Sequence, residues 1–267
     1  MSTFQVIILS LLTSVTEIIP VGAQAHLTLL TQFTGWSMSD TTVASAINWG
    51  LFAGMFFAFI HDWLSIVSST ITMILYRKKP MTFDERFPFF LIFIVAPTLF
   101  LKTYLPEPGI NSLFQSPWTL WIVSFVIGLS FLRIQSQNRR LKTFFVWNLI
   151  DSIVVGIAQI TSLIPGVGLF SPAVIVGGMK HYHWDAIYKY AALTATPFLL
   201  AQALEATQAG GTEWLSINVF LAIVLASVGS YFAAISFKQT IESRNLSNYG
   251  WYRIAIGVVG AVVTLFF

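Results

Sequence analysis

Four side chains that can carry charge lie inside long apolar stretches of this sequence: Glu17, His26, Asp151 and Lys189. Such residues are costly in an apolar surrounding and are usually functional. Glu17 and His26 stand nine residues apart, on either side of Pro20. A carboxylate beside an imidazole can move protons or orient a nucleophile, so this couple is the first candidate for a catalytic site. The structural alternative is that Glu17 forms an ion pair with His26 or with Lys189.

Asp151 fits a structural role better than a catalytic one. It stands at the start of the apolar run 152–164, and aspartate is a preferred helix N-cap, so we expect it to cap that helix. Two further cations, Lys102 and Arg253, lie within or near the ends of apolar runs, and we expect their long side chains to reach out to the interface. Four polar side chains surround a second interruption of an apolar run, at residues 165–168. They either satisfy freed backbone groups or contact a ligand, and they are Gln159, Thr161, Ser162 and Ser171.

The composition places this chemistry in a membrane. Of the 267 residues, 56% are hydrophobic and only 9% are charged, whereas a soluble protein carries about 25% charged residues. These charges are too few to cover a soluble surface, which excludes a soluble enzyme, a disordered chain and a nucleic-acid-binding protein. The sequence contains no cysteine, which excludes disulfides, thiolate metal ligands and cysteine nucleophiles. We expect membrane lipid to be the solvent of this protein.

The apolar stretches predict an all-α polytopic membrane protein. A crossing helix needs about 20 apolar residues, and six stretches approach this length: 43–60, 87–105, 117–132, 186–206, 215–237 and 249–267. The first either continues through 63–76 as one tilted helix or is followed by an interfacial helix. Regions 4–35 and 145–179 are each interrupted at proline and glycine, and the part after the break is too short to cross. We predict that each forms a re-entrant hairpin around a cavity enclosed by protein.

The charged loops predict the orientation of these segments. Lys and Arg gather in four loops, as Arg77, Lys78, Lys79 and Arg86, then Arg133, Arg139, Arg140 and Lys142, then Lys180, then Lys238 and Arg244. The intervening loops 106–116 and 207–214 contain Glu107 and Glu213 but neither Lys nor Arg. By the positive-inside rule the basic loops face the cytoplasm, so both termini are predicted to be periplasmic. The first hairpin then enters from outside and the second from inside.

The two hairpins begin alike, which predicts an inverted repeat. Residues 16–20 are TEIIP and residues 161–165 are TSLIP, at an offset of 145. Each segment is followed by a break that contains glycine, then by a short apolar half-helix and three crossings. We therefore predict a first repeat over 1–143, with hairpin 4–35, and a second over 144–267, with hairpin 145–179, in one membrane domain. Broken helices at matching positions of inverted halves indicate a binding site near the midplane.

The residues around the two breaks form two extended motifs. Residues 13–26 are TSVTEIIPVGAQAH, which keeps the Thr, Glu, Pro and His of a signature that is approximately E-G-x-T-E-F-L-P-[VI]-S-S-T-G-H. A second signature, approximately D-A-x-x-I-G-x-x-Q-x-x-A-[LI]-x-P-G-x-S-R-S-G, is matched at Asp151, Gly156, Gln159, Pro165 and Gly166. Residues 46–50, Pro97, Pro197 and 251–253 match further positions. The chain therefore resembles the undecaprenyl-diphosphate phosphatase (bacitracin-resistance) family along nearly its whole length.

This resemblance implies a fold and a reaction. The fold is six crossings with two opposed re-entrant hairpins, as derived above. The reaction is removal of the terminal phosphate of undecaprenyl diphosphate at the outer face of the bacterial inner membrane, which recycles the lipid carrier for cell-wall synthesis. Glu17 and His26 match the family's catalytic positions, and we predict substrate-binding side chains at Thr13, Thr16, Gln24, Gln159 and Ser171. The sequence identifies no certain cofactor, and it leaves a divalent cation and a homodimer open.

The sequence departs from both signatures at residues that the family uses for chemistry. Thr13 stands in place of the family's first glutamate, and Gly22 and Ala23 stand in place of its paired serines. The family's arginine is missing as well, because no Lys or Arg occurs between residues 143 and 179. Phosphoryl transfer depends on stabilising charge on the phosphate oxygens. We therefore expect a site that lacks the cation needed to cleave a diphosphate.

Two functions of different classes follow. In the first, the protein is a phosphatase, with His26 as nucleophile or acid/base and Glu17 as its orienting partner or base. In the second, the protein has lost hydrolysis and binds or flips a polyprenyl phosphate by alternating access of the inverted repeat. Both functions use the same ligand class.

Overall fold

The computed structural model describes residues 1–36, 40–104, 114, 116–137, 140–209, 214–243 and 245–266. Within these residues the chain is helical and forms no β-strand. The helices are α1 (Thr3–Ile18), α2 (Ala23–Thr34), α3 (Thr41–Ala58), α4 (Ile60–Leu75), α5 (Phe83–Tyr104), α7 (Pro117–Gln135), α8 (Leu149–Gln159), α9 (Ser171–Met179), α10 (Trp184–Ala209), α11 (Ile217–Glu242) and α12 (Leu246–Phe266). Short 3-10 turns, η1 (Phe144–Val146) and η2 (Ile160–Leu163), stand before and after α8. The predicted all-α fold class is confirmed.

Among the described residues, five helices are long and apolar enough to cross a membrane: α3, α5, α7 from Trp118, α11 and α12. They coincide with five of the six predicted crossings and support a multi-pass membrane protein. The sixth predicted crossing, 186–206, lies in α10, which has 26 residues but is less apolar. Much of α10, including Tyr188 and Tyr190, is buried against other helices. Polar side chains within membrane helices usually face the interior of the helix bundle. Because α10 is not among the described helices that are apolar enough to cross by composition, the sixth crossing stays a prediction.

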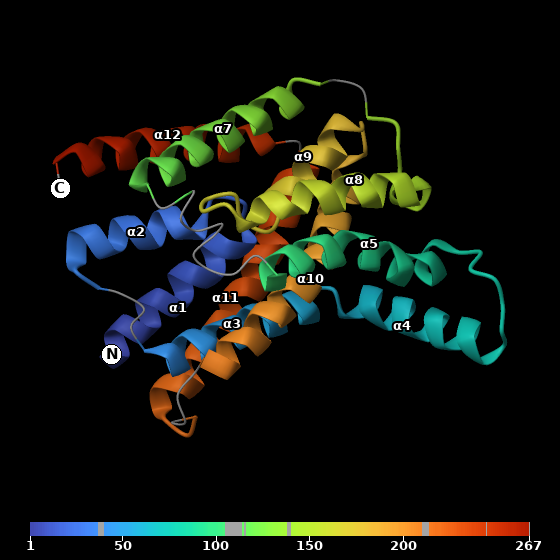
Figure 1. Cartoon of the computed structure of the whole chain (residues 1–267), viewed down its shortest axis with the longest axis horizontal. Helices are drawn as coiled ribbons and strands as arrows, with labels where there is room; N and C mark the ends of the chain where they lie inside the picture. Colours follow the sequence, from blue (N-terminus) through green and yellow to red (C-terminus); the bar gives the residue numbers. More distant parts are fainter. Residues whose placement is uncertain are drawn as a thin grey trace.

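The helices that flank the two breaks extend to opposite sides of the molecule (Figure 1). α1 and α2 extend to the side on which both chain termini lie, and they meet near the centre at residues 19–22. α8 and α9 extend to the other side, and the chain between them turns near the centre at residues 164–170. Residues of both breaks line one cavity. The two bends therefore lie side by side although they are far apart in the sequence.

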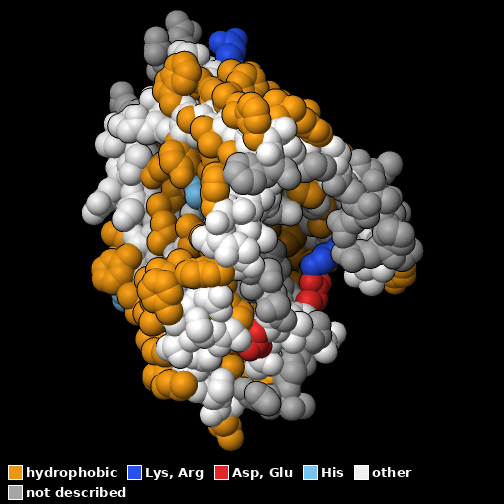
Figure 2. All heavy atoms as spheres, turned by 90° about the vertical axis from the view of Figure 1, so that its left-hand side faces the viewer, with side chains coloured by type: hydrophobic (Ala, Val, Ile, Leu, Met, Phe, Trp, Pro, Cys, Tyr) orange, Lys and Arg blue, Asp and Glu red, His pale blue; other side chains and the backbone are white. Residues whose placement is uncertain are grey.

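The surface agrees with a protein that is surrounded by lipid. Figure 2, which views the side of the termini, shows hydrophobic side chains over much of the described surface and charged side chains in a few places. The segments 76–82 and 140–148, which hold Arg77, Lys78, Lys79, Arg140 and Lys142, lie on the opposite side (Figure 1). Four residues used to predict the orientation, Glu107, Arg139, Glu213 and Arg244, lie outside the described residues.

Polar side chains begin several helices. Ser2 accepts a hydrogen bond from the backbone N–H of Gln5, and the Gln5 side chain accepts one from the N–H of Ser2. At the start of α3, Asp40 accepts from the N–H groups of Thr42 and Val43. These caps satisfy N–H groups that have no partner inside the helix, and each contributes about 1 kcal/mol.

Phe59 separates the first crossing from the helix that follows it. Its φ of −117° and ψ of 25° interrupt the helix, so the predicted extension over 63–76 is a separate helix, α4. In the first turn of α4, Asp62 forms an ion pair with Lys189 of α10. Lys189 therefore pairs with Asp62 and not with Glu17, which removes one structural alternative for Glu17.

Small residues allow two pairs of helices to approach closely. A Cβ placed on Gly54 of α3 would lie 1.9 Å from the Oγ of Ser230 in α11. A Cβ placed on Gly260 of α12 would lie 2.2 Å from the ring of Trp121 in α7. Because lipid is as apolar as the side chains, helices in membranes associate largely through such close packing. These contacts hold α11 against α3 and α12 against α7. They therefore also position the residues that α12 contributes to the site.

Replacing Gly54 by leucine is expected to destabilise the detergent-solubilised protein by about 1–3 kcal/mol, because the new side chain must push α11 away. Phe57→Leu is the matched control, since Phe57 lies on the same helix and is 61% exposed. Its effect should stay within about 0.5 kcal/mol. The thermal unfolding midpoint measures both, and equal midpoints for the two variants would show that α3 and α11 do not pack as described.

Candidate active site

Glycine makes both breaks possible. The chain turns sharply at residues 19–22, where Gly22 has a φ of +90°. It turns again at residues 164–168, where Gly166 has a φ of +92° and Gly168 a φ of +76°. Side chains rarely tolerate this left-handed conformation, whereas glycine adopts it at little cost. The proline in each break also turns the residue before it away from helical geometry, so both helices end where the sequence dictates.

The guanidinium group of Arg253, on α12, lies between the two breaks. Its Nε donates to the carbonyl oxygen of Pro20, in the first break, at 2.7 Å. In the second break, its Nη1 donates to the carbonyl of Gly166 at 2.7 Å, and its Nη2 donates to the carbonyl of Val167 at 3.1 Å. Nη2 also donates to the hydroxyl of Ser171 at 3.3 Å. The rigid fork of arginine can reach several acceptors at once, so one side chain ties both breaks together.

Two sequence-based expectations are wrong at this position. Arg253 does not reach the interface, because its side chain is 0% exposed. The site also does not lack a cation, because α12 supplies one although the second motif contains none. Lys102, by contrast, is 42% exposed and pairs with Glu205. The signal for Arg253 was its place in an apolar run, since a charge there is costly and usually has a function.

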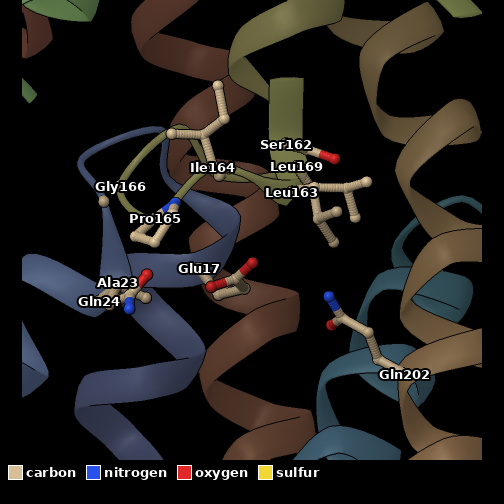
Figure 3. A pocket seen from close by; sticks show the side chains of 12 residues that line it. Glu17, Ala23, Gln24, Ser162, Leu163, Ile164, Pro165, Gly166, Leu169 and Gln202 are labelled. Atoms are coloured by element: carbon tan, nitrogen blue, oxygen red, sulfur yellow. The ribbon is translucent and has the colours of Figure 1, made fainter. Parts of the chain in front are cut away.

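A cavity of about 290 Å³ lies beside this clamp (Figure 3). The end of α1, the start of α2, both breaks and α10 contribute to its wall, with Glu17, Gly22, Gln24, Ser162, Gly166 and Gln202 among the lining residues. Figure 3 shows the carboxyl group of Glu17 and the amide of Gln202 turned toward each other. The cavity therefore offers a small polar head group a carboxylate, amide groups and the backbone of two turns.

Two of the five predicted site residues of the first hairpin line the cavity, and three do not. Glu17 and Gln24 line the wall. The hydroxyl of Thr16 donates to a carbonyl of its own helix at 2.6 Å, so it satisfies the backbone. The hydroxyl of Thr13 is buried and has no hydrogen-bond partner among the described residues. Neither threonine is among the residues that line the cavity.

The predicted site residues of the second hairpin, Gln159 and Ser171, do not line the cavity but form hydrogen bonds at the break. Gln159 is buried and donates to the carbonyl of Leu169 at 3.1 Å. Ser171 is buried and accepts the hydrogen bond from Arg253. Gln202 was not predicted, although a polar side chain inside the apolar run 186–206 was an available signal.

His26 lies next to the cavity rather than in its wall. Its Nδ1 is 2.8 Å from the carbonyl oxygen of Gly22, and its Nε2 is 2.6 Å from the hydroxyl of Tyr252 on α12. Arg253 is close enough to act electrostatically on both Glu17 and His26. The structure thus groups the two predicted catalytic residues around one guanidinium, and among the described residues no hydrogen bond or ion pair joins them directly.

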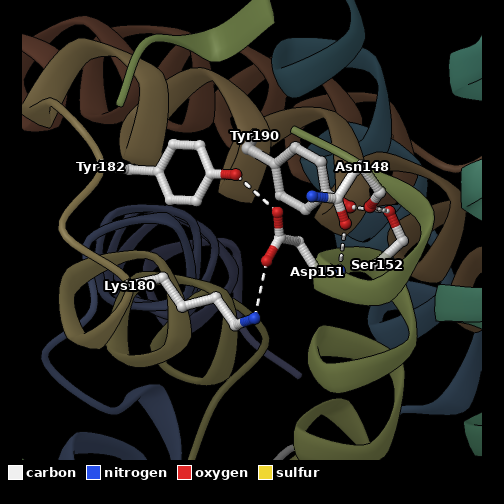
Figure 4. A network of polar contacts seen from close by, with 6 residues as sticks. All are labelled: Asn148, Asp151, Ser152, Lys180, Tyr182 and Tyr190. Carbon is white, nitrogen blue, oxygen red and sulfur yellow. Dashed lines mark hydrogen bonds and ion pairs between the residues drawn. The ribbon is translucent and has the colours of Figure 1, made fainter. Parts of the chain in front are cut away.

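The prediction that Asp151 caps its helix is wrong. Asn148 is the N-cap of α8, and its Oδ1 accepts from the backbone N–H of Asp151 at 3.0 Å. Because the cap lies three residues earlier, Asp151 falls inside the first turn of the helix. Its carboxylate pairs with Lys180 at 2.6 Å and accepts a hydrogen bond from the hydroxyl of Tyr182 at 2.6 Å (Figure 4).

This polar cluster holds the ends of the second hairpin. Asp151 lies in the first turn of α8 and Lys180 directly follows α9, so their ion pair joins the two helices at the ends remote from the break. The hydroxyls of Ser152 and Tyr190 are 2.9 Å apart, which connects α8 to α10 (Figure 4). The cluster therefore holds α8 and α9 in a fixed relative position, and with them the break that Arg253 contacts.

Replacing Asp151 by asparagine is expected to lower the free energy of unfolding by about 1–3 kcal/mol, because Lys180 then loses its counter-ion in a largely buried setting. Glu242→Gln is the matched control: Glu242 is 42% exposed and lies 3.9 Å from Lys238. An exposed pair of this kind contributes about 0.5 kcal/mol or less. The two variants are compared by thermal unfolding in the same detergent, and an equal loss in both would contradict a role for the cluster in the fold.

The comparison with protein families decides what kind of protein carries this site. Residues 6–259 match the family described as bacitracin resistance protein BacA, which covers most of the chain. The chain belongs to the BacA family. The resemblance predicted from the two motifs is therefore confirmed.

Named relatives of this BacA family member match it from end to end at low identity. It is 23% identical over 262 residues to the "Undecaprenyl-diphosphatase" of Gemmatimonas aurantiaca, with 97% of each chain covered. It is 26% identical over 272 residues to the protein of that name in Pelobacter propionicus, covering 99% of this chain and 97% of the other. The protein of that name in Geotalea daltonii is also 26% identical over 272 residues, with 98% of each chain covered.

The cavity of this BacA family member does not provide the ligand set of a dedicated divalent-cation site. Ca²⁺ and Mg²⁺ take six or more oxygen ligands, often with more than one carboxylate. Glu17 is the one carboxylate among the lining residues. In the described part of the chain, no three Asp, Glu, His or Cys side chains lie close enough together to hold a metal ion. These residues give no support to the divalent cation that the sequence left open.

Proposed function

We propose that this protein removes the terminal phosphate of a polyprenyl diphosphate, such as undecaprenyl diphosphate, in the bacterial inner membrane. The reaction recycles the lipid carrier for cell-wall synthesis. Family membership and the names of the relatives support the substrate class. One observation carries the proposal: the cavity between the two breaks has a carboxylate in its wall and a buried guanidinium beside it.

The proposed membrane arrangement has six crossings, α3, α5, α7, α10, α11 and α12, and two re-entrant hairpins, α1–α2 and α8–α9. The hairpins start the two halves of an inverted repeat, 1–143 and 144–267. Both termini lie on one side and the basic segments 76–82 and 140–148 on the other (Figure 1), which supports periplasmic termini. Gln202 lies in the second half of α10, and that end of the helix points to the side of the termini (Figure 1).

Positioning and electrostatic stabilisation of the phosphate provide most of the catalysis in reactions of this class. The first turn of α2 has no side-chain cap, and uncapped N–H groups at a helix start are suited to bind phosphate oxygens. Arg253 adds positive charge at the same place, because its guanidinium carbon would lie 3.6 Å from a Cβ on Gly22. The negative charge that develops on the terminal phosphate therefore meets backbone donors and a cation.

Glu17 acts as the general base in this proposal. It accepts a proton from a water molecule while the water oxygen bonds to the terminal phosphorus. The bond from that phosphorus to the bridging oxygen breaks, and its electron pair stays on the oxygen of the departing polyprenyl monophosphate. Inorganic phosphate is the second product. Gln202, which faces Glu17 (Figure 3), can hydrogen-bond the water molecule or a phosphate oxygen.

One observation favours the second function, in which a polyprenyl phosphate is bound or flipped but not cleaved. Arg253 directs its hydrogen bonds to three backbone carbonyls and one hydroxyl of the breaks. Most of its N–H groups are therefore not free to clamp a phosphate. The small residues Gly22 and Ala23, at the positions of the family's serines, offer no hydroxyl to the cavity.

The two functions are separated by giving the purified protein farnesyl diphosphate in detergent. Release of inorganic phosphate that saturates with substrate supports the phosphatase. A thermal midpoint that rises with farnesyl phosphate, without any phosphate release from the diphosphate, supports binding without hydrolysis. Faster movement of labelled polyprenyl phosphate across the liposome bilayer, compared with liposomes without protein, would then identify the protein as a flippase.

A further inference from the structure

Both ring nitrogens of His26 are occupied in the structure. Nδ1 lies 2.8 Å from the carbonyl oxygen of Gly22. Because a carbonyl oxygen carries no proton, Nδ1 must donate this hydrogen bond, which fixes the proton of the neutral ring on Nδ1. The lone pair of Nε2 then accepts the hydroxyl of Tyr252, at 2.6 Å. The tautomer of His26 is therefore set by one backbone group and one phenol.

Tyr252 also determines how the ring lies. The two rings are nearly parallel, with 9° between their planes and 5.6 Å between their centroids. Tyr252 precedes Arg253, so consecutive residues of α12 serve the first hairpin at two places: Arg253 binds the carbonyl of Pro20, and Tyr252 binds His26. The position of the imidazole is thus tied to the same helix that holds the breaks together.

This arrangement bears on the role of His26. A nucleophilic imidazole needs a free lone pair on the attacking nitrogen, and here the phenol hydroxyl of Tyr252 occupies it. His26 is also not among the residues that line the cavity, whereas Gly22, to which it is bonded, is among them. His26 is therefore placed to act on the cavity through the backbone of Gly22, and not by attack on phosphorus.

We propose that Tyr252 is a positioning residue, which holds His26 in the Nδ1–H tautomer with its ring fixed beside the first break. The inference rests on the proposed phosphatase function. In that reaction the correctly held imidazole orients the Gly22 turn and the start of α2, where the phosphate binds. The attacking group remains water, so no phosphohistidine forms at His26.

The test uses Tyr252→Phe, which keeps the ring and removes the hydroxyl, in the full-length protein with farnesyl diphosphate as substrate. We expect kcat to fall about tenfold, while KM stays within about twofold because Glu17, Gln24 and Gln202 still line the cavity. Tyr231→Phe is the matched control, since Tyr231 is 38% exposed on α11 and lies outside the site. In a His26→Asn background, removal of the Tyr252 hydroxyl should cost no further activity, because the two residues act as one unit.

A second measurement does not depend on activity. In protein labelled with ¹⁵N in its histidines, the His26 signals are assigned by their loss in His26→Asn. The proposal predicts a protonated Nδ1 and an unprotonated Nε2 in the wild type, and a change in the Nε2 signal in Tyr252→Phe. A wild-type proton on Nε2, or an unchanged kcat in Tyr252→Phe, would overturn the proposal. If the wild type releases no phosphate, the phosphatase function fails, and the nitrogen signals alone decide whether Tyr252 positions His26.

Discussion

Arg253→Lys is expected to abolish phosphate release, by more than about 100-fold, and to lower the free energy of unfolding by at least about 3 kcal/mol. Lysine keeps the charge, but a single ammonium group cannot replace a planar fork that reaches several acceptors. The carbonyls of Pro20, Gly166 and Val167 would lose their donor in a buried position. Each unsatisfied buried acceptor costs about 1–3 kcal/mol. The two breaks would then separate, and the cavity between them would lose its shape.

Arg133→Lys is the matched control for this change, because Arg133 is an exposed arginine in the last turn of α7. Its effect on stability should stay within about 0.5 kcal/mol. Thermal unfolding and phosphate release are measured on both variants. If Arg253→Lys is as stable as Arg133→Lys, the guanidinium does not hold the breaks together.

Glu17→Gln is expected to lower phosphate release by about 100-fold or more, because the cavity loses its proton acceptor. The fold should be little affected, since the amide has nearly the same shape and Glu17 forms no ion pair in the described part of the chain. The thermal midpoint is therefore expected to change by less than that of Arg253→Lys. Binding of farnesyl diphosphate should persist, since backbone donors and Arg253 remain in place.

Glu242→Gln serves as the control for Glu17→Gln, since it makes the same chemical change at an exposed glutamate outside the cavity. Its rate of phosphate release should equal that of the wild type. Comparable rates for the two variants would exclude Glu17 as the base. A loss of binding together with rate in Glu17→Gln would instead place the carboxylate in substrate binding.

Much of the fold follows from local sequence signals. The five apolar spans and both breaks were predicted because length, proline and glycine act within a few residues of the structure they cause. α10 is an exception. It is largely buried, and its buried polar residues Tyr188, Tyr190, Thr194 and Thr196 face protein and make the helix less apolar than the five other spans. The environment of α10 is set by the helices packed around it, and the local sequence pattern does not reveal which helices these are.

The site was predictable in part, because local sequence signals reveal some of its residues but not their long-range partners. Glu17 and Gln24 were predicted because they flank a break, and both line the cavity. Arg253 was taken for an interfacial side chain, because its partners lie 82 to 233 residues away in the sequence. Asp151 was assigned to a local cap, whereas its partner Lys180 comes from the far end of the hairpin. Long-range partners of single charged residues are set by packing, which neither spacing nor composition reveals.

The most direct test of the central claim is phosphate release from undecaprenyl diphosphate labelled in its terminal phosphate, by wild-type protein reconstituted in liposomes. The structure predicts that wild-type protein releases labelled inorganic phosphate and leaves undecaprenyl phosphate in the membrane, and that Glu17→Gln does so at about one hundredth of that rate or less. Equal release by the two proteins would contradict the assignment of the cavity as the active site. No release by the folded wild-type protein would contradict the phosphatase function itself.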